Sequence, residues 1–348
     1  MESVTVTIVT YNSREFVLSC LEAVFRQDYA PLEVVVVDNG STDGTREILA
    51  SFAGRISIEL NDINSGFAAA QNQAIRRASG DWIFVLNPDV VLEPDFIRQL
   101  VEAAGRDERI GTVCGRLRAI GRDLKPPERP RIDTAGIYFA PSMRHFDRGS
   151  GELDGEQFRR TEYVFGASAA AALYRREMID DISEGGEFFD PDFFAYREDA
   201  DVAWRAQLLG WRCLFVPRAA GFHVRSVRPG PRNVVPAVLN MHSVKNRFLL
   251  RIKNATGGVY WRFWPAATLR DLLVLGGCLV WEWRSLPAFG HIVRCLPRAL
   301  RRRRWIMRRR RVSDEVLAEW FSIQSRGIKE PRNQGVRESR SPGVEAAL

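Results

Sequence analysis

Residues 33–45 read EVVVVDNGSTDGT, in which four consecutive valines lead directly into a run of polar side chains and glycines. A compact β-branched run is typical of a strand that is buried on both faces of a parallel sheet. The polar residues 38–44 mark the end of this strand and the turn that follows it. A second such run, VTVTIVT at residues 4–10, also leads into polar side chains. Together the two runs predict neighbouring buried strands with polar carboxyl ends.

Helix-like segments alternate with strand-like runs along the first hundred residues. Helices are expected at residues 14–27, 44–52 and 67–78 and after Pro94, and further strands at 56–60 and 82–87. This βαβ rhythm predicts an open, doubly wound α/β sheet, in which ligands bind beyond the carboxyl ends of the strands. Residues 115–165 are irregular and predict loops with short strands, and a helix at 199–209 and a strand at 212–216 follow.

Polar clusters follow three of the expected strands, at residues 10–12, 38–44 and 87–89. One cluster alone is explained by a turn and a helix cap, because Asp, Ser and Thr are favoured N-caps. Three clusters on neighbouring strands face one crevice, which favours a nucleotide pocket. The chain contains no Gly-rich Walker A or GxGxxG pattern, which disfavours P-loop and dinucleotide-binding proteins.

Five segments, taken in order, resemble a known family. They are TIVTYNS, VVVVDNGSTDGT, NDINSGFAAAQNQAI, FVLNPDVVL and FFDPDFFAYREDADVAWRAQLLGW, spread over residues 3–255. Their order and spacing resemble the family 2 glycosyltransferases of the GT-A fold, and among these the rhamnosyltransferase-like subgroup. The resemblance implies a Rossmann-like, mostly parallel sheet flanked by helices. It also implies an inverting enzyme that moves a sugar, rhamnose as first choice, from a nucleotide-diphospho-sugar to a hydroxyl of a lipid-linked or polysaccharide acceptor in cell-envelope glycan synthesis.

The resemblance implies residues that bind the donor, which would be a dTDP- or UDP-sugar. Thr10, Tyr11 and Asp38 would hold the base and ribose. Asn39 occupies a position where many relatives carry a second Asp, so the choice between uracil and thymine stays open. The segment containing Asn64 and Gly66 opens a helix and would approach the nucleotide or donor sugar, although it also reads as a plain helix start.

The segment LNPD resembles the subgroup's form of the metal-binding DxD motif, with Asp89 as the carboxylate that reaches a divalent cation. Mg²⁺ or Mn²⁺ neutralises charge on a diphosphate leaving group while keeping several waters, so one protein carboxylate can suffice. Asn87 departs from the acidic first position of that motif and would lie against the donor. His223, in GFHVRS, is either a further metal or diphosphate ligand or a structural hydrogen-bonding residue.

The segment FFAYREDADVAWR groups three carboxylates within four residues, Glu198, Asp199 and Asp201. An inverting transfer needs a general base, because the acceptor hydroxyl must lose its proton as it attacks. The resemblance assigns this role to Asp199. Asp201 and Arg205 are four residues apart and are expected to pair on one helix face. Glu198 lies at the helix start, where the dipole tolerates an anion, and would contact the acceptor.

The C-terminal quarter is basic and rich in tryptophan. Residues 283–313 contain eleven arginines and no acid, so the rest of the chain carries −4 of the net charge of +7. The longest uncharged apolar run there, residues 272–281, has ten residues, whereas a membrane span needs about 20. We therefore expect an interfacial anchor on an anionic membrane surface. A solvated helix pair or a homo-oligomer contact is the alternative, and nucleic acid is disfavoured because no recognised module accompanies the arginines.

The expected organisation is a catalytic domain at residues 1–255, a helical membrane-associating region at 256–325 and a disordered tail at 326–348. The catalytic domain divides into a nucleotide-sugar half, 1–115, and an acceptor half, 116–255. Five scattered cysteines and the lack of a secretory signal predict reduced thiols and a cytoplasmic location on the inner face of the cell membrane. The alternatives for function are a sugar nucleotidyltransferase and a non-catalytic nucleotide-sugar-binding membrane scaffold.

Overall fold

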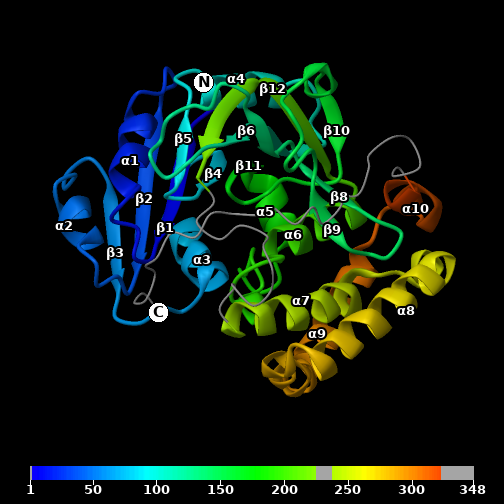
Figure 1. Cartoon of the computed structure of the whole chain (residues 1–348). Coiled ribbons are helices and arrows are strands. Elements are labelled where there is room, and N and C mark those ends of the chain that lie inside the picture. The colour runs from blue at the N-terminus through cyan, green and yellow to red at the C-terminus, as the bar shows by residue number, and fades with distance from the viewer. Residues whose placement is uncertain (1, 225–236, 323–348) are drawn as a thin grey trace.

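The computed structural model describes residues 2–224 and 237–322, so the tail expected at 326–348 lies outside the described residues. A central sheet carries helices on both faces, and a group of C-terminal helices packs below it (Figure 1). The strands are β1 Val4–Thr10, β2 Leu32–Asn39, β3 Ser57–Asn61, β4 Trp82–Leu86, β5 Val90–Leu92, β6 Ile110–Ala119, β7 Arg131–Thr134, β8 Ile137–Phe139, β9 His145–Asp147, β10 Glu162–Val164, β11 Ala171–Arg175 and β12 Arg212–His223. The helices are α1 Val17–Phe25, α2 Thr45–Ala50, α3 Phe67–Arg77, α4 Phe96–Ala104, α5 Arg176–Ile182, α6 Glu198–Leu208, α7 Ala237–Asn254, α8 Gly257–Val280, α9 Pro287–Arg309 and α10 Asp314–Ser322, with short 3-10 turns η1 Glu156–Phe158, η2 Pro191–Phe193 and η3 Trp283–Ser285.

The sheet has the order β10-β12-β6-β11-β4-β1-β2-β3, with β5 and β7 paired off this path. Strands β4, β1, β2 and β3 are parallel neighbours, whereas β11 runs antiparallel between β4 and β6. Thr10 pairs in register with Asp38, so the polar ends of β1 and β2 lie side by side. The predicted α/β class and mostly parallel sheet are therefore confirmed, with the expected polar ends at one edge.

Strands β6 and β12, which lie beyond β11 in the sheet, differ from the expectation. Strand β6 falls partly within the stretch expected to be irregular, because its glycines and arginines hide the strand pattern. Gly115 is required there, since a Cβ would lie 2.6 Å from the Phe96 ring and 2.4 Å from the Ala219 carbonyl oxygen. Strand β12 continues past Pro217 to His223, through an irregularity in its pairing with β6 between Val216 and Ala220. A bulge of this kind accommodates a proline within a strand.

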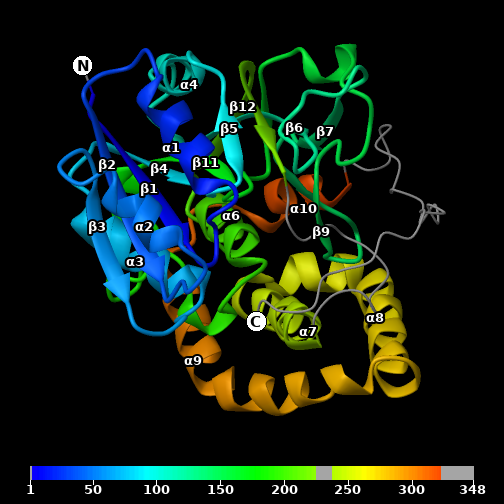
Figure 2. The same ribbon diagram turned by 60° about the vertical axis from the view of Figure 1, so that its left-hand side comes forward.

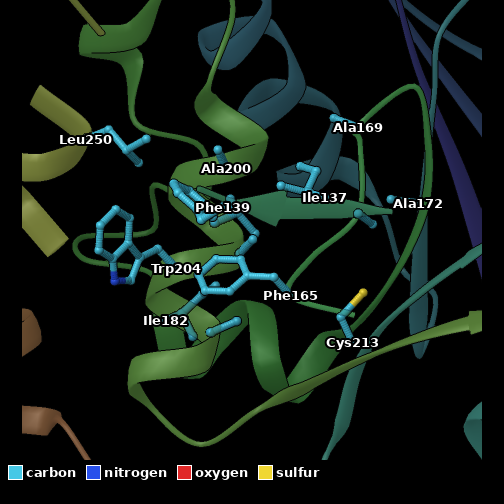
Figure 3. Close-up of a cluster of buried hydrophobic side chains, with 14 of the residues drawn as sticks. Ile137, Phe139, Phe165, Ala169, Ala172, Ile182, Ala200, Trp204, Cys213 and Leu250 are labelled. Carbon is cyan, nitrogen blue, oxygen red and sulfur yellow. The ribbon is translucent and has the colours of Figure 1, made fainter. Parts of the chain in front are cut away.

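Helix α6 and the C-terminal helices share one core (Figure 3). Trp204 of α6 packs edge-on to Phe139, with ring centroids 4.9 Å apart, and Phe139 lies 4.6 Å from Phe165. Leu250 of α7 and Phe321 of α10 belong to the same cluster. The helices that follow residue 236 are thus packed against the domain that carries the acidic segment. All five cysteines are free thiols, as expected.

The arginines of residues 283–313 do not form a single outward-facing basic surface, because several of them pair with acids of this chain. Arg298 pairs with Asp192 at 2.9 Å, and Arg302 lies buried against Asp190 and Glu187. Further pairs join Arg301 to Glu184, Arg309 and Arg311 to Asp181, and Arg310 to Asp314. Six of the eleven arginines thus form ion pairs within the chain.

Helix α8 also differs from the expectation drawn from its ten-residue uncharged run. It continues for 24 residues, and by length and composition alone it is long and apolar enough to cross a membrane. The run appeared too short because Arg270 and Asp271 interrupt it, yet both residues lie within the same continuous helix. Figure 2 shows α8 beside α7 and the first part of α9 running beneath α7. The C-terminal part of α9 returns to the domain, where Arg302 pairs with Asp190 and Arg309 with Asp181.

Candidate functional site

The ends of β1 and β2 form one polar cluster. Asp38 is fully buried, and its carboxylate accepts hydrogen bonds from Thr10 Oγ1 at 2.9 Å, the Ser41 amide at 3.0 Å and Arg46 Nε at 2.7 Å. Asp38 therefore fixes the turn after β2, and any contact with a nucleotide would be made beside these bonds. Tyr11 directly follows β1 and is exposed.

Asn39 connects the end of β2 to the turn before α3. Its Nδ2 donates to Asn64 Oδ1 at 2.9 Å and to the Gly66 carbonyl at 3.3 Å. Its Oδ1 accepts from the Ser65 amide and from Asn61 Nδ2, each at 3.1 Å. An aspartate could not make the first two bonds because a carboxylate has no N–H to donate. The departure from the usual acid thus has a local structural cause.

Asp89 and His223 come together although 134 positions separate them in the printed sequence. Strand β12 pairs antiparallel with β5, which places His223 opposite Val90. His223 Nε2 lies 3.2 Å from Asp89 Oδ1, and its Nδ1 lies 2.7 Å from Asp133 Oδ2. Burial opposes protonation, but the hydrogen bonds to Asp133 and Asp89 raise the pKa of His223 to about 9. The two predicted metal ligands therefore lie together.

This pair fits a divalent cation in its donor chemistry. Asp89 Oδ1 and His223 Nε2, a carboxylate oxygen and an imidazole nitrogen, lie 3.2 Å apart, and Asp133 contacts the other ring nitrogen, as carboxylates do for metal-bound histidines. Because the pKa of His223 is raised to about 9, the ring would have to release a proton to bind a cation. Across residues 2–224 and 237–322, no group of three or more His, Cys, Asp or Glu residues forms a complete metal site. The remaining ligands would therefore be water and diphosphate oxygens, the usual arrangement for Mg²⁺ in phosphate sites.

The three acids of the FFAYREDADVAWR segment have different environments. Glu198 is buried, and burial followed by the charge of Asp199 raises its pKa well above the usual value. Its predicted role as an anion in contact with the acceptor is therefore not favoured, because the neutral form is preferred. Asp201 pairs with Arg205 at 2.9 Å, as predicted, and also with Lys253 at 2.8 Å.

Asp199, the predicted base, is half-buried and accepts hydrogen bonds from the backbone. Its carboxylate accepts from the Ala169 amide at 3.4 Å and from the Ala200 amide at 2.7 Å. The carbonyl of the adjacent Ala170 accepts from the Asn87 amide at 2.9 Å. Two hydrogen bonds to neighbouring residues, Ala169 and Ala170, thus connect Asp199 to the segment that carries Asp89. Both acids therefore lie in the same region, at the end of β4.

The loop before α6 connects the acidic segment to the donor side. Phe194, Tyr196 and Arg197 all have positive φ angles, of 63°, 68° and 73°. Each such residue costs about 1–2 kcal/mol, so the surrounding structure must hold the loop in place. The Phe194 carbonyl accepts from the Ala68 amide at 3.2 Å, and a Cβ on Gly66 would lie 2.5 Å from the Phe194 ring. Gly66 therefore allows the loop to reach the start of α3.

Sequence reasoning missed several residues that organise the site. Asp133 lies in a segment with no motif, and Lys253 and Asn246 lie on α7, which was assigned no site residue. Lys253 is 1% exposed and lies 2.5 Å from Asp190. Buried charged and polar residues in a helix give no periodic signal, so only the fold shows their role.

Comparison with known proteins shows similarity to glycosyltransferases. The model of the family described as "Glycosyl transferase family 2" matches residues 5–183. The N-acetylglucosaminyl-diphospho-decaprenol L-rhamnosyltransferase of Mycobacterium tuberculosis is 27% identical over 286 residues, covering 78% of this chain and 90% of the relative. The poly-beta-1,6-N-acetyl-D-glucosamine synthase of Staphylococcus epidermidis is 24% identical over 225 residues, covering 63% of this chain. This chain spans about half of that synthase, 49% of its length.

Solved structures show the same fold. GalNAc-T7 with UDP, GalNAc and Mn²⁺ aligns with a TM-score of 0.57 and 15% identity, covering 73% of this chain and 48% of the other. Residues 1–349 of S. aureus TarS align with a TM-score of 0.53 and 14% identity, covering 93% and 91%. At this identity the likeness concerns the fold alone. Together with the family match over more than half of the sequence, it establishes that the chain belongs to glycosyl transferase family 2.

Proposed function

We propose that this protein is an inverting glycosyltransferase that moves a sugar from a nucleotide-diphospho-sugar to a hydroxyl of a cell-envelope glycan. The observation that supports the proposal is the contact between Asp89 and His223. This contact lies in the same region of the structure as Asp199. A cation bound through the first pair and a base at the third residue are the two groups that such a displacement needs.

The roles follow from the chemistry of each group. Asp199 accepts the proton of the acceptor hydroxyl as that oxygen attacks the anomeric carbon opposite the leaving diphosphate. Asp89 and His223 would hold Mg²⁺ or Mn²⁺, which would neutralise charge on the leaving diphosphate. Asp133 keeps His223 oriented toward Asp89. Glu198 is buried next to Asp199 in the sequence, and burial raises its pKa, so it is proposed to shape the site and not to act as the base.

Donor and acceptor are proposed from the relatives. The alignment with the N-acetylglucosaminyl-diphospho-decaprenol L-rhamnosyltransferase covers 78% of this chain. This similarity supports a dTDP-rhamnose donor and a lipid-linked acceptor. A solved TarS structure in complex with UDP-GlcNAc supports a UDP-sugar as the second choice. Thr10, Tyr11, Asp38, Asn39, Asn64, Gly66 and Asn87 are proposed to line the donor pocket.

Product analysis tests the proposal. The purified chain is incubated with dTDP-rhamnose, UDP-GlcNAc and other nucleotide-sugars in the presence of Mn²⁺ or Mg²⁺. We expect release of nucleoside diphosphate from one donor, lost on chelation. Pyrophosphate release would instead identify a nucleotidyltransferase. Binding without any turnover, with acceptor lipid present, would identify the non-catalytic scaffold.

We also propose that α8 attaches the protein to the cytoplasmic membrane surface. The charged side chain of Asp271 faces inward and pairs with Arg247 at 3.3 Å and with Arg251. Leu272 and Leu279 face outward and are 60% and 69% exposed. A helix that faces water has the reverse arrangement, and only 17% of the most apolar stretch of α8 is buried within the protein. The outward face is thus suited to lipid.

The arginines add less than their number indicates, because six form ion pairs within the chain. Arg284, Arg294, Arg304 and Arg308 are exposed and have no recorded ion pair within residues 2–224 and 237–322. At about 1 kcal/mol for each residue near an anionic surface, these four support the apolar contact but do not replace it.

Vesicle sedimentation tests this attachment. The pair Leu272→Ser and Leu279→Ser should weaken binding of the full chain to phosphatidylglycerol-containing vesicles by about tenfold or more, because the buried apolar area falls. Ile63→Ser, at another exposed apolar position, is the control and should bind like the wild type. Unchanged binding of the double variant, or a dimer that dissociates on the same substitutions, would assign α8 to another contact.

A further inference from the structure

The loop at residues 193–197 is the feature on which this inference rests. It directly precedes Glu198 and Asp199, and three of its five residues have positive φ angles. Such a backbone does not hold itself, because left-handed conformations are unfavourable for residues with a Cβ. The position of Asp199 therefore depends on whatever fixes this loop.

One side chain of α7 contacts the loop at three points. Asn246 is fully buried, and its Nδ2 donates to the carbonyls of Phe193 at 2.8 Å, Ala195 at 2.8 Å and Tyr196 at 2.7 Å. Its Oδ1 has no hydrogen-bond partner among the described residues. The side-chain amide of Asn246 thus bonds only through its donor group. The Phe193 carbonyl also accepts from the Ala195 amide at 2.7 Å, so Asn246 matters most for the carbonyls of Ala195 and Tyr196.

A second contact holds the end of the same loop. Arg197 Nε donates to the Ser243 carbonyl at 3.2 Å, and Ser243 lies one turn before Asn246 on α7. The loop is therefore held against one face of α7 over its full length. Helix α7 begins 54 residues beyond the end of the family match, so the family's sequence pattern does not include it.

We propose that Asn246 is a positioning residue for sugar transfer, which fixes the loop at residues 193–197 and so aims Asp199 at the acceptor hydroxyl. This inference rests on the proposed function. Asn246 does not touch the reacting groups and acts through the loop. Its loss displaces the base and leaves the polar ends of β1 and β2 unchanged, because those ends are held by Asp38 and Asn39.

Kinetics of Asn246→Ala and Asn246→Asp test the proposal. The Asp variant keeps the shape but has no N–H to donate to the three carbonyls. Both should lower kcat by about 10²-fold, the effect of a small misplacement of a reacting group, while KM for the donor changes by less than about threefold. Val244→Ala is the matched control, since Val244 is buried on α7 but packs against Val274 and Cys278, away from the loop.

A structural readout keeps the test independent of activity. Amide hydrogen exchange across residues 193–197 should be faster in Asn246→Ala than in the wild type and unchanged in Val244→Ala. Should Asn246→Ala fail to fold, Asn246→Ser takes its place. Wild-type kcat in the folded variants, an equal loss of kcat in Val244→Ala, or unchanged exchange in the loop would each overturn the proposal. A wild-type chain that transfers no sugar, with the exchange result intact, would overturn the proposed function instead.

Discussion

The donor side and the catalytic loop are held in place by different means. On the donor side, Thr10 bonds to Asp38 and Asn39 bonds to Asn64, over 28 and 25 positions of sequence. The loop that leads to Asp199 is held by Asn246, and the segment before it by Lys253 and Arg302, the last from 115 positions away. The first arrangement joins neighbouring strand ends and the helix that follows them, whereas the second depends on α7 and α9, which come after the last strand in the sequence.

The family match covers only part of the chain. It stops at residue 183, after the donor strands and before the first acid of FFAYREDADVAWR. The acids of that segment need a partner element, and in this chain α7 and α9 provide it. The C-terminal helices therefore hold the acidic segment in place as well as providing a proposed attachment to the membrane.

Among the substitutions that test this difference, the largest loss of stability is expected from replacing Lys253. Its Nζ lies between Asp190 and Asp201 at 2.5 and 2.8 Å, in a fully buried position. Lys253→Met leaves two carboxylates without their shared cation and should lower the free energy of unfolding by about 3–5 kcal/mol. Lys125→Met, at an exposed site, should change it by less than about 0.5 kcal/mol. Urea unfolding measures both.

The same network predicts a pH dependence. Burial opposes ionisation of Asp190 and Asp201, yet Lys253 holds the pKa of each below its usual range. Their contribution is complete above the ordinary carboxyl pKa of about 3.9 and is lost as the pH falls below it. The difference in stability between wild type and Lys253→Met should therefore be constant near neutral pH and shrink below about pH 4. A difference that grows in acid would contradict the assignment.

A smaller effect is expected at Asp133, which contacts Nδ1 of His223. Asp133→Asn removes the charge behind His223 and should weaken Mn²⁺ binding by about 10- to 100-fold. Titration of the chain with Mn²⁺ in the presence of UDP, followed by calorimetry, measures this. Asp154→Asn is the control, because Asp154 is a buried carboxylate paired with Arg116 and Arg118. Equal Mn²⁺ affinity in the two variants would remove Asp133 from the site.

The smallest effect is expected on the donor side itself. Asn39→Asp loses the bonds to Asn64 and to the Gly66 carbonyl and should lower the free energy of unfolding by about 1–3 kcal/mol. Turnover should fall much less than in the Asn246 variants, because the catalytic loop keeps its own contacts. Thermal unfolding and steady-state kinetics on the same sample separate the two. A loss of turnover as large as in Asn246→Ala would mean that the regions are not held independently.

Much of the donor side was predictable from the sequence, because β-branched runs followed by Asp38 and Asp89 indicate buried parallel strands with polar ends. The pairing of Asp201 with Arg205 was also predictable, from helical spacing alone. The contacts of Asp133 and Asn246 were not, because no spacing rule connects a buried polar residue to a partner 50 or more positions away. The arginines of α9 were misjudged for the same reason: their acidic partners lie in the 181–192 segment.

The central claim is that Asp199 is the base in sugar transfer and lies opposite a cation held through Asp89. The direct measurement is Asp199→Asn, with UDP affinity in Mn²⁺ and turnover determined on one preparation. We predict that turnover falls by about 10²- to 10⁴-fold while UDP affinity stays within about threefold of the wild type. Turnover equal to that of the wild type would show that another group removes the acceptor proton and would contradict the account.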